Sequence, residues 1–136
     1  MSFDPAAADW RLMKAGPMPA GLGIPWSRRV EGVWEYGMLT RPDHVNPAGA
    51  VHGGVLMTFA DHVLGLYVWA VSKGAPNVTI QLNTHFLAAV APGDFVVLRG
   101  QVTRGAKSLV FVRALLSVGE RDVVAADGIW RVFPAP

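Results

Sequence analysis

The pattern of apolar and polar positions changes once along this chain. From Gly53 to about Val71, apolar residues point in nearly every direction around a helix, which predicts a helix of about five turns that is buried on all sides. After Lys73, apolar and polar residues alternate one by one, which is the period of a strand with two different faces. The chain is therefore expected to place one long helix before a set of strands.

Five strands are predicted, one before the helix and four after it. The first covers Val33–Leu39. In the second, residues 78–86, one face is expected to carry Val78, Ile80, Leu82 and Phe86, and the other Thr79, Gln81, Asn83 and His85. The last three, at about residues 95–103, 108–118 and 123–133, are separated by the turn-forming segments APGD, RGAK and GERD. Strands joined by such short turns predict an α+β fold, an antiparallel sheet that curls around the single helix.

Residues 1–30 are expected to form an arm on a single domain made by residues 31–136. Within the arm, Asp4 and Pro5 are suited to start a short helix that runs to about Lys14. Residues 15–26 are rich in Gly and Pro, which predicts a covering loop.

One segment combines two features that destabilise a helix. It reads NPAGAVHGGVLMTFAD, from Asn46 to Asp61, and it starts the long helix on two glycines and places a carboxylate inside it. Glycine in a helix costs about 1 kcal/mol relative to alanine, and a buried carboxylate is costly unless it is paired or protonated. The helix face that holds Asp61 also holds Gly54 and Gly65. These small residues predict a groove with Asp61 in its floor.

The two glycines also open the start of the helix to a ligand. Without side chains, Gly53 and Gly54 let an oxygen atom approach the unpaired N–H groups, where the helix dipole favours negative charge. The helical rise puts Asp61 about 12 Å from Gly53 along the axis. Either a substrate extends along the groove, or two chains contribute different halves of one site.

Composition narrows the class of protein. The 136 residues are 51% hydrophobic and 16% charged, as in a compact globular domain, and they include no cysteine, which suits a reducing cytoplasm. The 12 basic residues are scattered, so nucleic acid is not an expected partner. No uncharged apolar stretch reaches the roughly 20 residues of a membrane span, so no membrane partner is expected. The spacing of His52 and His62 fits no usual helical ligand pattern, so no metal is expected.

The unusual segment and two later ones resemble a known family. Asn46, Pro47, Gly49, His52, Gly53, Gly54 and Asp61, then VTIQLNTHFL from Val78 and PGD from Pro92, are similar to the hotdog-fold acyl-CoA thioesterases of the phenylacetate-pathway type. The resemblance covers residues 33–133. It implies the hotdog fold and hydrolysis of a thioester to a carboxylic acid and free coenzyme A. It implies no cofactor, since coenzyme A is part of the substrate.

The resemblance also implies roles for the matched positions. Asp61 would be the nucleophile or general base, the Gly53 N–H would hold the thioester carbonyl, and Asn46 would help to orient it. Thr79 matches a hydroxyl that positions the hydrolytic water, and His52 either takes part in the chemistry or fixes the turn into the helix. In the family such a site is assembled across a dimer, which implies a homodimer, or a tetramer made of two dimers, with sites at the subunit interface.

A further set of residues would bind the coenzyme A part of the substrate. It comprises Gly54, Phe86 and the turn made by Arg104, Gly105, Ala106, Lys107 and Ser108. Arg104 and Lys107 are suited to phosphate because the nucleotide is a polyanion. Relatives often have glycine where this chain has Ala106.

Two other functions fit the same residues. A non-catalytic acyl-CoA-binding or sensing protein with this fold would bind a thioester without releasing its thiol. A hotdog enoyl-CoA hydratase would use Asp61 and His52 as an acid and base pair across a carbon–carbon bond.

Overall fold

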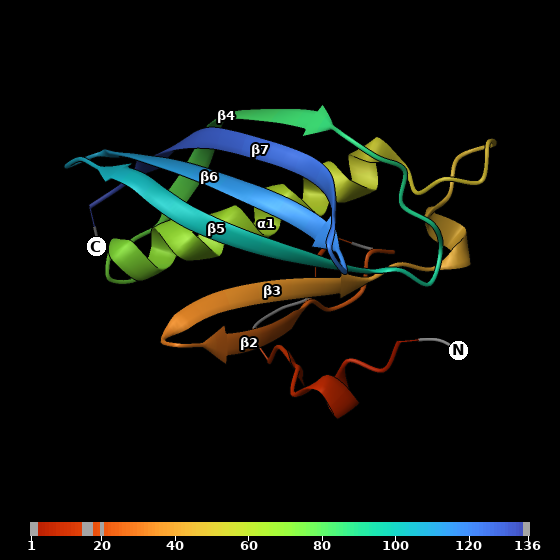
Figure 1. The fold of residues 1–136 in the computed structure, drawn as a ribbon. Helices are drawn as coiled ribbons and strands as arrows, with labels where there is room; N and C mark the ends of the chain where they lie inside the picture. Colours follow the sequence, from red (N-terminus) through yellow and green to blue (C-terminus); the bar gives the residue numbers. More distant parts are fainter. Residues whose placement is uncertain (1–2, 15–17, 20, 135–136) are drawn as a thin grey trace.

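The structure, a computed structural model, describes residues 3–14, 18–19 and 21–134. Its strands form one antiparallel seven-stranded sheet in the order β1-β2-β3-β5-β6-β7-β4. The strands are β1 (Arg11–Leu12), β2 (Trp26–Val30), β3 (Val33–Leu39), β4 (Asn77–Phe86), β5 (Phe95–Gly105), β6 (Leu109–Val118) and β7 (Arg121–Val132). One long helix, α1 (Gly53–Val71), lies across the sheet, and two 3₁₀ helices cover Ala6–Ala8 and Pro42–His44 (Figure 1).

The central elements agree with the sequence pattern, and the fold class is confirmed as one helix enclosed by an antiparallel sheet. The bounds of α1 and β3 are the predicted ones, and β4 to β7 differ from prediction by a few residues at their ends. The sheet has seven strands where five were predicted.

The two extra strands come from the arm. The sequence of β2, WSRRV, has three polar residues in a row and so lacks the alternation that predicts a strand. Its pairing with β3 is set by a two-residue turn, Glu31 and Gly32, in which both residues have positive φ. Such a turn matches the twist of two paired strands, so turn geometry rather than hydrophobic pattern adds β2 to the sheet.

The predicted helix in the arm is much shorter than expected. The Asp4 carboxylate accepts a hydrogen bond from the Ala6 N–H at 3.1 Å, as a residue at a helix start does. The 3₁₀ helix then ends at Ala8, because Asp9 takes a left-handed conformation, and β1 follows at Arg11. Residues 15–17 and 20 of the expected loop lie outside the described residues, and the described Met18 is buried in the core.

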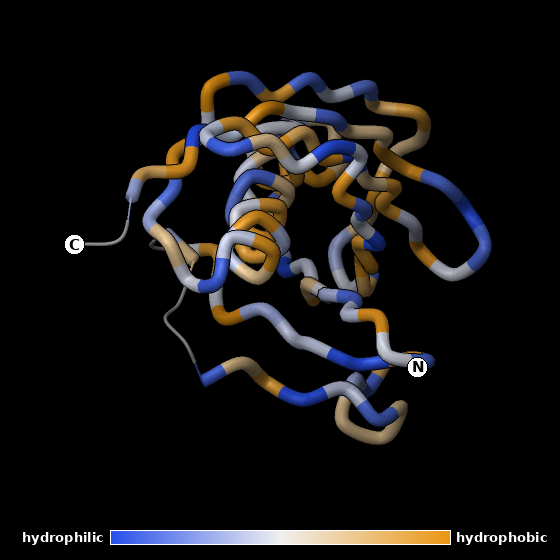
Figure 2. The backbone as a smooth tube through the Cα atoms, turned by 90° about the vertical axis from the view of Figure 1, so that its left-hand side faces the viewer, coloured by the Kyte–Doolittle hydropathy of each residue, from blue (hydrophilic) through white to orange (hydrophobic). Residues whose placement is uncertain are grey.

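Helix α1 is buried on one side and not all round as the sequence pattern suggested. Six residues face the concave side of the sheet: Leu56, Phe59, Ala60, Val63, Leu64 and Val68. Viewed along its axis, the helix lies inside the curl of the sheet (Figure 2). Met57, Trp69 and Val71 on the other side are 36%, 55% and 53% exposed. Helix α1 is long and apolar enough to cross a bilayer by composition, but here it is the central helix of the folded core.

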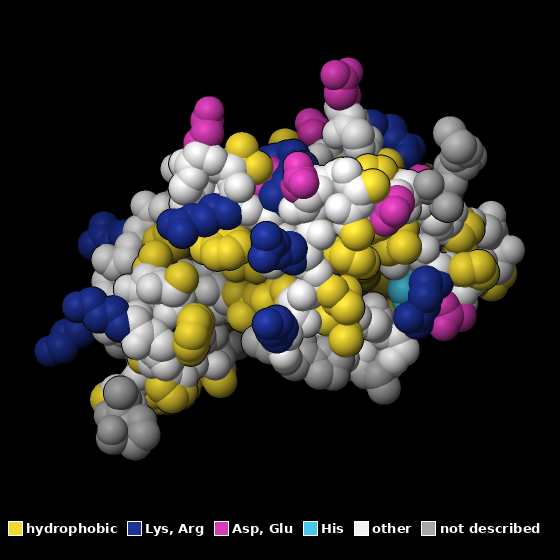
Figure 3. All heavy atoms as spheres, turned by 90° about the horizontal axis from the view of Figure 1, so that it is seen from below, with side chains coloured by type: hydrophobic (Ala, Val, Ile, Leu, Met, Phe, Trp, Pro, Cys, Tyr) yellow, Lys and Arg dark blue, Asp and Glu magenta, His cyan; other side chains and the backbone are white. Residues whose placement is uncertain are grey.

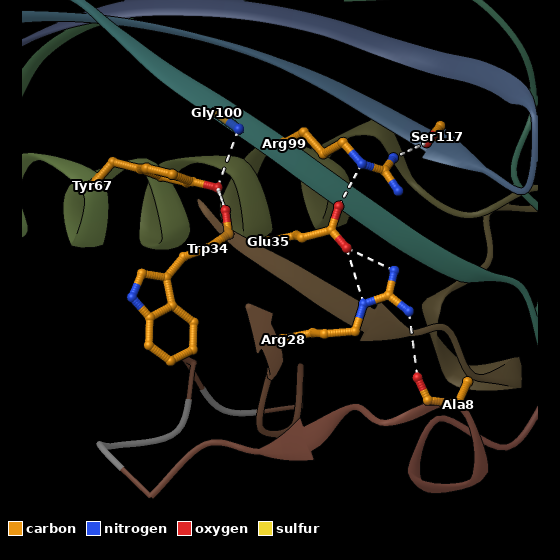
Figure 4. Close-up of polar contacts among 8 residues, drawn as sticks. All are labelled: Ala8, Arg28, Trp34, Glu35, Tyr67, Arg99, Gly100 and Ser117. Atoms are coloured by element: carbon orange, nitrogen blue, oxygen red, sulfur yellow. Dashed lines mark hydrogen bonds and ion pairs between the residues drawn. The ribbon is translucent and has the colours of Figure 1, made fainter. Parts of the chain in front are cut away.

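A buried carboxylate links the arm to the neighbouring strands of the sheet (Figure 4). Glu35 in β3 is 5% exposed, and Arg28 and Arg99 bind its two oxygens at 2.6 and 2.5 Å. Arg28 also donates to the Ala8 carbonyl, and Arg99 donates to the Ser117 hydroxyl. Each oxygen of the buried carboxylate is paired with a guanidinium group, so its negative charge is compensated. Glu35 is therefore a structural residue that joins the arm, β3, β5 and β6.

Tyr67 bridges β3 and β5 where their direct pairing stops. The register pairs Tyr36 with Leu98 but does not continue to Trp34 and Gly100. At that point the Tyr67 hydroxyl accepts from the Gly100 N–H at 3.1 Å and donates to the Trp34 carbonyl at 2.6 Å (Figure 4). Burial, above all, raises the pKa of Tyr67 to about 12, so the hydroxyl keeps its proton and its donor role at neutral pH.

Replacing Tyr67 with Phe should destabilise the protein by about 1–3 kcal/mol, because the substitution leaves two backbone groups without a partner. Urea unfolding of the wild type and Tyr67→Phe measures the difference. A change smaller than a few tenths of a kcal/mol would mean that water replaces the hydroxyl and that the bridge is unimportant.

Candidate active site

Asp61 and Thr79 are brought together from different elements. Asp61 lies in the middle of α1, and Thr79 lies in β4. The Thr79 hydroxyl donates to Asp61 Oδ1 at 2.5 Å. The second carboxylate oxygen has no hydrogen-bond or ion-pair partner among the described residues. The carboxylate is thus held at one oxygen and free at the other.

A β-bulge aims Thr79 at the helix. The pairing of β4 with β7 shifts between Thr79, opposite Trp130, and Gln81, opposite Ile129, which leaves Ile80 as the extra residue. The predicted alternation, which put Thr79 on the face opposite Leu82 and Phe86, is therefore wrong at this point. Val78 and Ile80 are 51% and 54% exposed, while Thr79 bonds to Asp61 on the helix side. Simple alternation does not reveal an inserted residue.

A cavity of about 400 Å³ opens beside the carboxylate. Its wall includes Asp61, Thr79, Gly65, Trp69, Asn77 and Trp130. The predicted groove exists at Asp61 and Gly65, but Gly54 lies outside this cavity. The sequence had pointed to Asp61, Thr79 and the small residue Gly65; it did not single out Asn77 or Trp130, which no motif marks.

His62 is the other ionisable group at the cavity. Burial lowers the pKa of His62, and the neighbouring Asp61 carboxylate opposes this effect by raising it. The net lowering favours a neutral imidazole at neutral pH. Among the described residues, no cation forms an ion pair with Asp61, and no group of three His, Asp or Glu side chains is placed to hold a metal ion.

The start of α1 carries open donors. His52 is the N-cap residue, with no side-chain hydrogen bond to the helix. The N–H groups of Gly53 and Gly54 have no acceptor among the described residues. A side chain at Gly54 would meet nothing within 4 Å, whereas a Cβ at Gly53 would lie 3.0 Å from the ring of Phe86. Gly54 thus leaves access, and Gly53 makes room for Phe86.

Asn46 and His52 shape the approach to the helix. Asn46 Oδ1 accepts hydrogen bonds from the N–H groups of Ala48 and Ala50, at 2.9 and 3.2 Å, and so closes the loop before the helix. The amide nitrogen of Asn46 has no partner among the described residues and remains a donor. The His52 backbone bonds to the His44 carbonyl, while its side chain is exposed.

The predicted site residues form three groups within one chain. Asp61 and Thr79 form the first, and Asn46, His52, Gly53, Gly54 and Phe86 at the helix start form the second. The uninterrupted helix separates Gly53 from Asp61 by about 12 Å along its axis. The third group, Arg104 to Ser108, is the exposed β5–β6 turn, in which neither Arg104 nor Lys107 forms an ion pair with another described residue.

The architecture is that of the hotdog fold, in which an antiparallel sheet encloses one long helix. The sequence profile of the thioesterase superfamily matches residues 48–125, more than half of the chain. The protein therefore belongs to the thioesterase superfamily, a family of thioester hydrolases.

Two of the curated proteins similar to this chain show how far the similarity extends. A Pseudomonas aeruginosa protein named as a predicted esterase is 35% identical over 91 residues, which are 65% of this chain and 67% of that protein. Human acyl-coenzyme A thioesterase 13 is 27% identical over 91 residues, 67% of this chain and 65% of that protein. The match thus spans about two thirds of the length of each relative.

Solved structures share the fold. A hypothetical thioesterase of Streptococcus pneumoniae, crystallised with coenzyme A, has a TM-score of 0.69 at 24% identity, over 78% of this chain and 82% of its own. The PaaI protein of the Escherichia coli phenylacetic acid degradation operon has a TM-score of 0.68 at 17% identity, over 96% of this chain and 83% of its own. At these identities the likeness shows the fold.

The two glycines at the helix start should respond differently to alanine. Gly54→Ala places its methyl group in open space and should stabilise the protein by up to about 1 kcal/mol through helix propensity. Gly53→Ala should gain less, because its methyl group would press on Phe86. Urea unfolding of both variants measures this; equal gains would show that the ring moves aside at no cost.

Proposed function

We propose that this protein is a cytoplasmic acyl-CoA thioesterase that hydrolyses its substrate to a carboxylic acid and free coenzyme A. The observation that carries the proposal is the Asp61 carboxylate, held by Thr79 at one oxygen and open at the other, beside a largely apolar cavity. The family membership and the coenzyme A bound to the pneumococcal relative support the choice of thioester.

Asp61 supplies the basic group of the reaction. It either attacks the thioester carbonyl carbon or removes a proton from a water molecule that attacks it. In both cases a carbon–oxygen bond forms, the carbon–sulfur bond breaks, and the coenzyme A sulfur leaves as thiolate and takes up a proton. Direct attack by Asp61 gives a mixed anhydride, which a water molecule then hydrolyses to release the acid and restore the carboxylate. The hydrogen bond from Thr79 fixes the carboxylate orientation, so that the free oxygen faces the cavity.

The Gly53 N–H stabilises the negative charge that develops on the carbonyl oxygen. It is an unpaired donor at the positive end of the helix dipole, beside the Phe86 ring on one side and the open space over Gly54 on the other. The free amide N–H of Asn46, just before the helix, is a second donor suited to orient the same carbonyl.

A second copy of the chain brings Gly53 and Asp61 together. β4 is an edge strand of ten residues that pairs only with β7 and exposes Val78, Ile80 and Phe86 by 51–54%. Long apolar edges are normally covered. The face in Figure 3, which lies on the opposite side of the molecule from β4 in Figure 1, carries apolar patches between separated Lys and Arg side chains. A homodimer, alone or as half of a tetramer, would cover the β4 edge.

Symmetry then completes the site. Within one chain, Thr79 bonds to Asp61, and Phe86 contacts the position of Gly53. If two copies of β4 pair antiparallel about their centre, the Phe86 end of one strand lies opposite the Thr79 end of the other. The Gly53 donor of one copy then approaches the Asp61 carboxylate of the other, which removes the 12 Å separation.

The β5–β6 turn binds the nucleotide of coenzyme A. Arg104 and Lys107 are exposed on this turn and form no ion pairs with described residues, so their charges are available for phosphate. Gly105, Ala106 and Ser108 offer small side chains and backbone groups around them.

Asp61→Asn should lower kcat by about 10²–10⁴ and leave the fold intact, because the amide keeps the shape but cannot act as base or nucleophile. Thiol release from a panel of acyl-CoA esters measures turnover, and circular dichroism checks the fold. Asp122→Asn, the same change at an exposed position of β7, is the control and should keep full activity. Near-normal turnover by Asp61→Asn would remove Asp61 from the mechanism.

The wild type distinguishes the alternative functions. Tight acyl-CoA binding with no thiol release would favour a sensor, and water addition to an enoyl-CoA without thiol release would favour a hydratase.

Mixing two inactive variants tests whether the site is shared between chains. Gly53→Pro removes the N–H donor at a helix position where proline is tolerated, and His52 before it already has the extended conformation that proline requires. Gly53→Ala adds the same Cβ atom next to Phe86 but keeps the donor, so it should retain much more activity.

Co-refolded Asp61→Asn and Gly53→Pro chains should regain about a quarter of the wild-type sites, because each heterodimer contains one site with both native residues. Either variant alone should stay inactive. If the mixture stays inactive although native mass spectrometry shows mixed oligomers, each chain has its own complete site.

A further inference from the structure

The cavity wall beyond Asp61 carries a hydrogen-bond donor and an acceptor next to one glycine. Gly65 follows Asp61 by one helical turn, about 6 Å along α1. A Cβ built on Gly65 would lie 3.8 Å from Trp130 Nε1 and 3.7 Å from Asn77 Oδ1. All three residues line the same cavity as Asp61. The space over Gly65 is thus bordered by two polar atoms.

The donor is the indole N–H of Trp130. This residue of β7 is 1% exposed, and its N–H has no hydrogen-bond partner among the described residues. Buried tryptophans usually pair this group. No completely buried side-chain nitrogen or oxygen lacks a partner in the described part of the chain. The Trp130 N–H is therefore in contact with the cavity and available to a ligand there.

The acceptor is the side-chain oxygen of Asn77. The amide nitrogen of Asn77 donates to the Gly65 carbonyl at 3.5 Å. Because a backbone carbonyl only accepts hydrogen bonds, this contact fixes which end of the amide is nitrogen. The oxygen then faces the space over Gly65 without a hydrogen-bond partner among the described residues. One group that can both accept and donate would satisfy Trp130 and Asn77 together, and a hydroxyl is such a group.

We propose that the acyl group of the substrate carries a hydroxyl about one helical turn from the thioester carbonyl, which accepts from Trp130 Nε1 and donates to Asn77 Oδ1. The proposal rests on the acyl-CoA thioesterase function above and adds the chemical class of its substrate, a hydroxyacyl thioester. Trp130 and Asn77 are specificity residues in this view, and Gly65 is small because the hydroxyl occupies the space beside it.

Selectivity follows from the cost of unpaired polar groups. An acyl group with a methyl in place of the hydroxyl would displace water from Trp130 and Asn77 and leave both without partners. Sites built to bind a hydroxyl discriminate strongly against an analogue that lacks it, whereas sites built only for apolar groups discriminate weakly. We expect a preference of about tenfold or more in kcat/KM.

A matched substrate pair measures the preference. The probes are 6-hydroxyhexanoyl-CoA and heptanoyl-CoA, which differ by a hydroxyl in place of a methyl group. The wild type should release thiol faster from the hydroxyacyl ester at low substrate concentration. Calorimetry with Asp61→Asn measures binding of the same two esters without turnover, so recognition is tested even where hydrolysis is not seen.

Two variants and one control test whether Trp130 and the space over Gly65 cause the preference for the hydroxyacyl ester. Trp130→Phe removes the donor and keeps an aromatic ring, and it should reduce the ratio of the two kcat/KM values to about one. Trp10→Phe is the control: Trp10 is also nearly buried, 4% exposed, but lies outside the cavity, so its ratio should match the wild type. Gly65→Ala fills the space over both polar atoms at ordinary contact distances, so it should fold normally and also abolish the preference.

The outcomes separate this inference from the proposed function. Equal kcat/KM for both esters in an active wild type, or a preference that persists in Trp130→Phe and Gly65→Ala, would overturn the hydroxyl assignment while the thioesterase function stands. If Asp61→Asn binds the hydroxyacyl ester more tightly than heptanoyl-CoA but the wild type releases no thiol from either ester, the hydroxyl recognition is supported and the hydrolytic function is overturned.

Discussion

The one-sided packing of α1 against the curved sheet is the interaction on which the rest of this structure depends. The helix begins on two glycines without a side-chain cap, so its own sequence favours it weakly at that end. Six buried side chains compensate. Five of them are large and apolar, and each such side chain contributes about 1.5–3 kcal/mol when it is fully buried. Because packing on one face holds the helix, the opposite face is free to carry a carboxylate, a histidine and a glycine that would weaken a helix selected for stability alone.

The period of the sequence was enough to predict the helix and the order of the central strands, because those elements satisfy the same alternation that the core requires. It failed where geometry departs from a regular period. The extra residue Ile80 reverses the face of Thr79, and a two-residue turn at Glu31 and Gly32 adds β2 without any hydrophobic alternation. The apolar residues around α1 suggested complete burial, because a single sequence does not show that Met57, Trp69 and Val71 face away from the sheet.

The candidate site also contains some residues that the sequence predicted and others that it did not. The motif from Asn46 to Asp61 located the acid and the open donors, since glycine and carboxylate in a helix are locally unfavourable and visible as such. Trp130 and Asn77 carry no such signature: a tryptophan in a strand and an asparagine after a turn are ordinary in both places. Only the fold reveals that their polar atoms meet over Gly65, in the cavity that also holds Asp61.

Helical geometry makes the strongest argument for a shared site. An oxyanion donor acts within about 3 Å of the carbonyl oxygen, and the base or nucleophile must lie as close to the reacting carbon or its attacking water. A continuous helix cannot shorten the separation of about 12 Å between Gly53 and Asp61. In the proposed homodimer, a twofold axis through the centre of the exposed β4 edge would solve both problems at once: it would cover the apolar edge and exchange the Thr79 and Phe86 ends of the strand between copies. The surface that costs stability in the single chain would then be the one that completes the chemistry in the proposed pair.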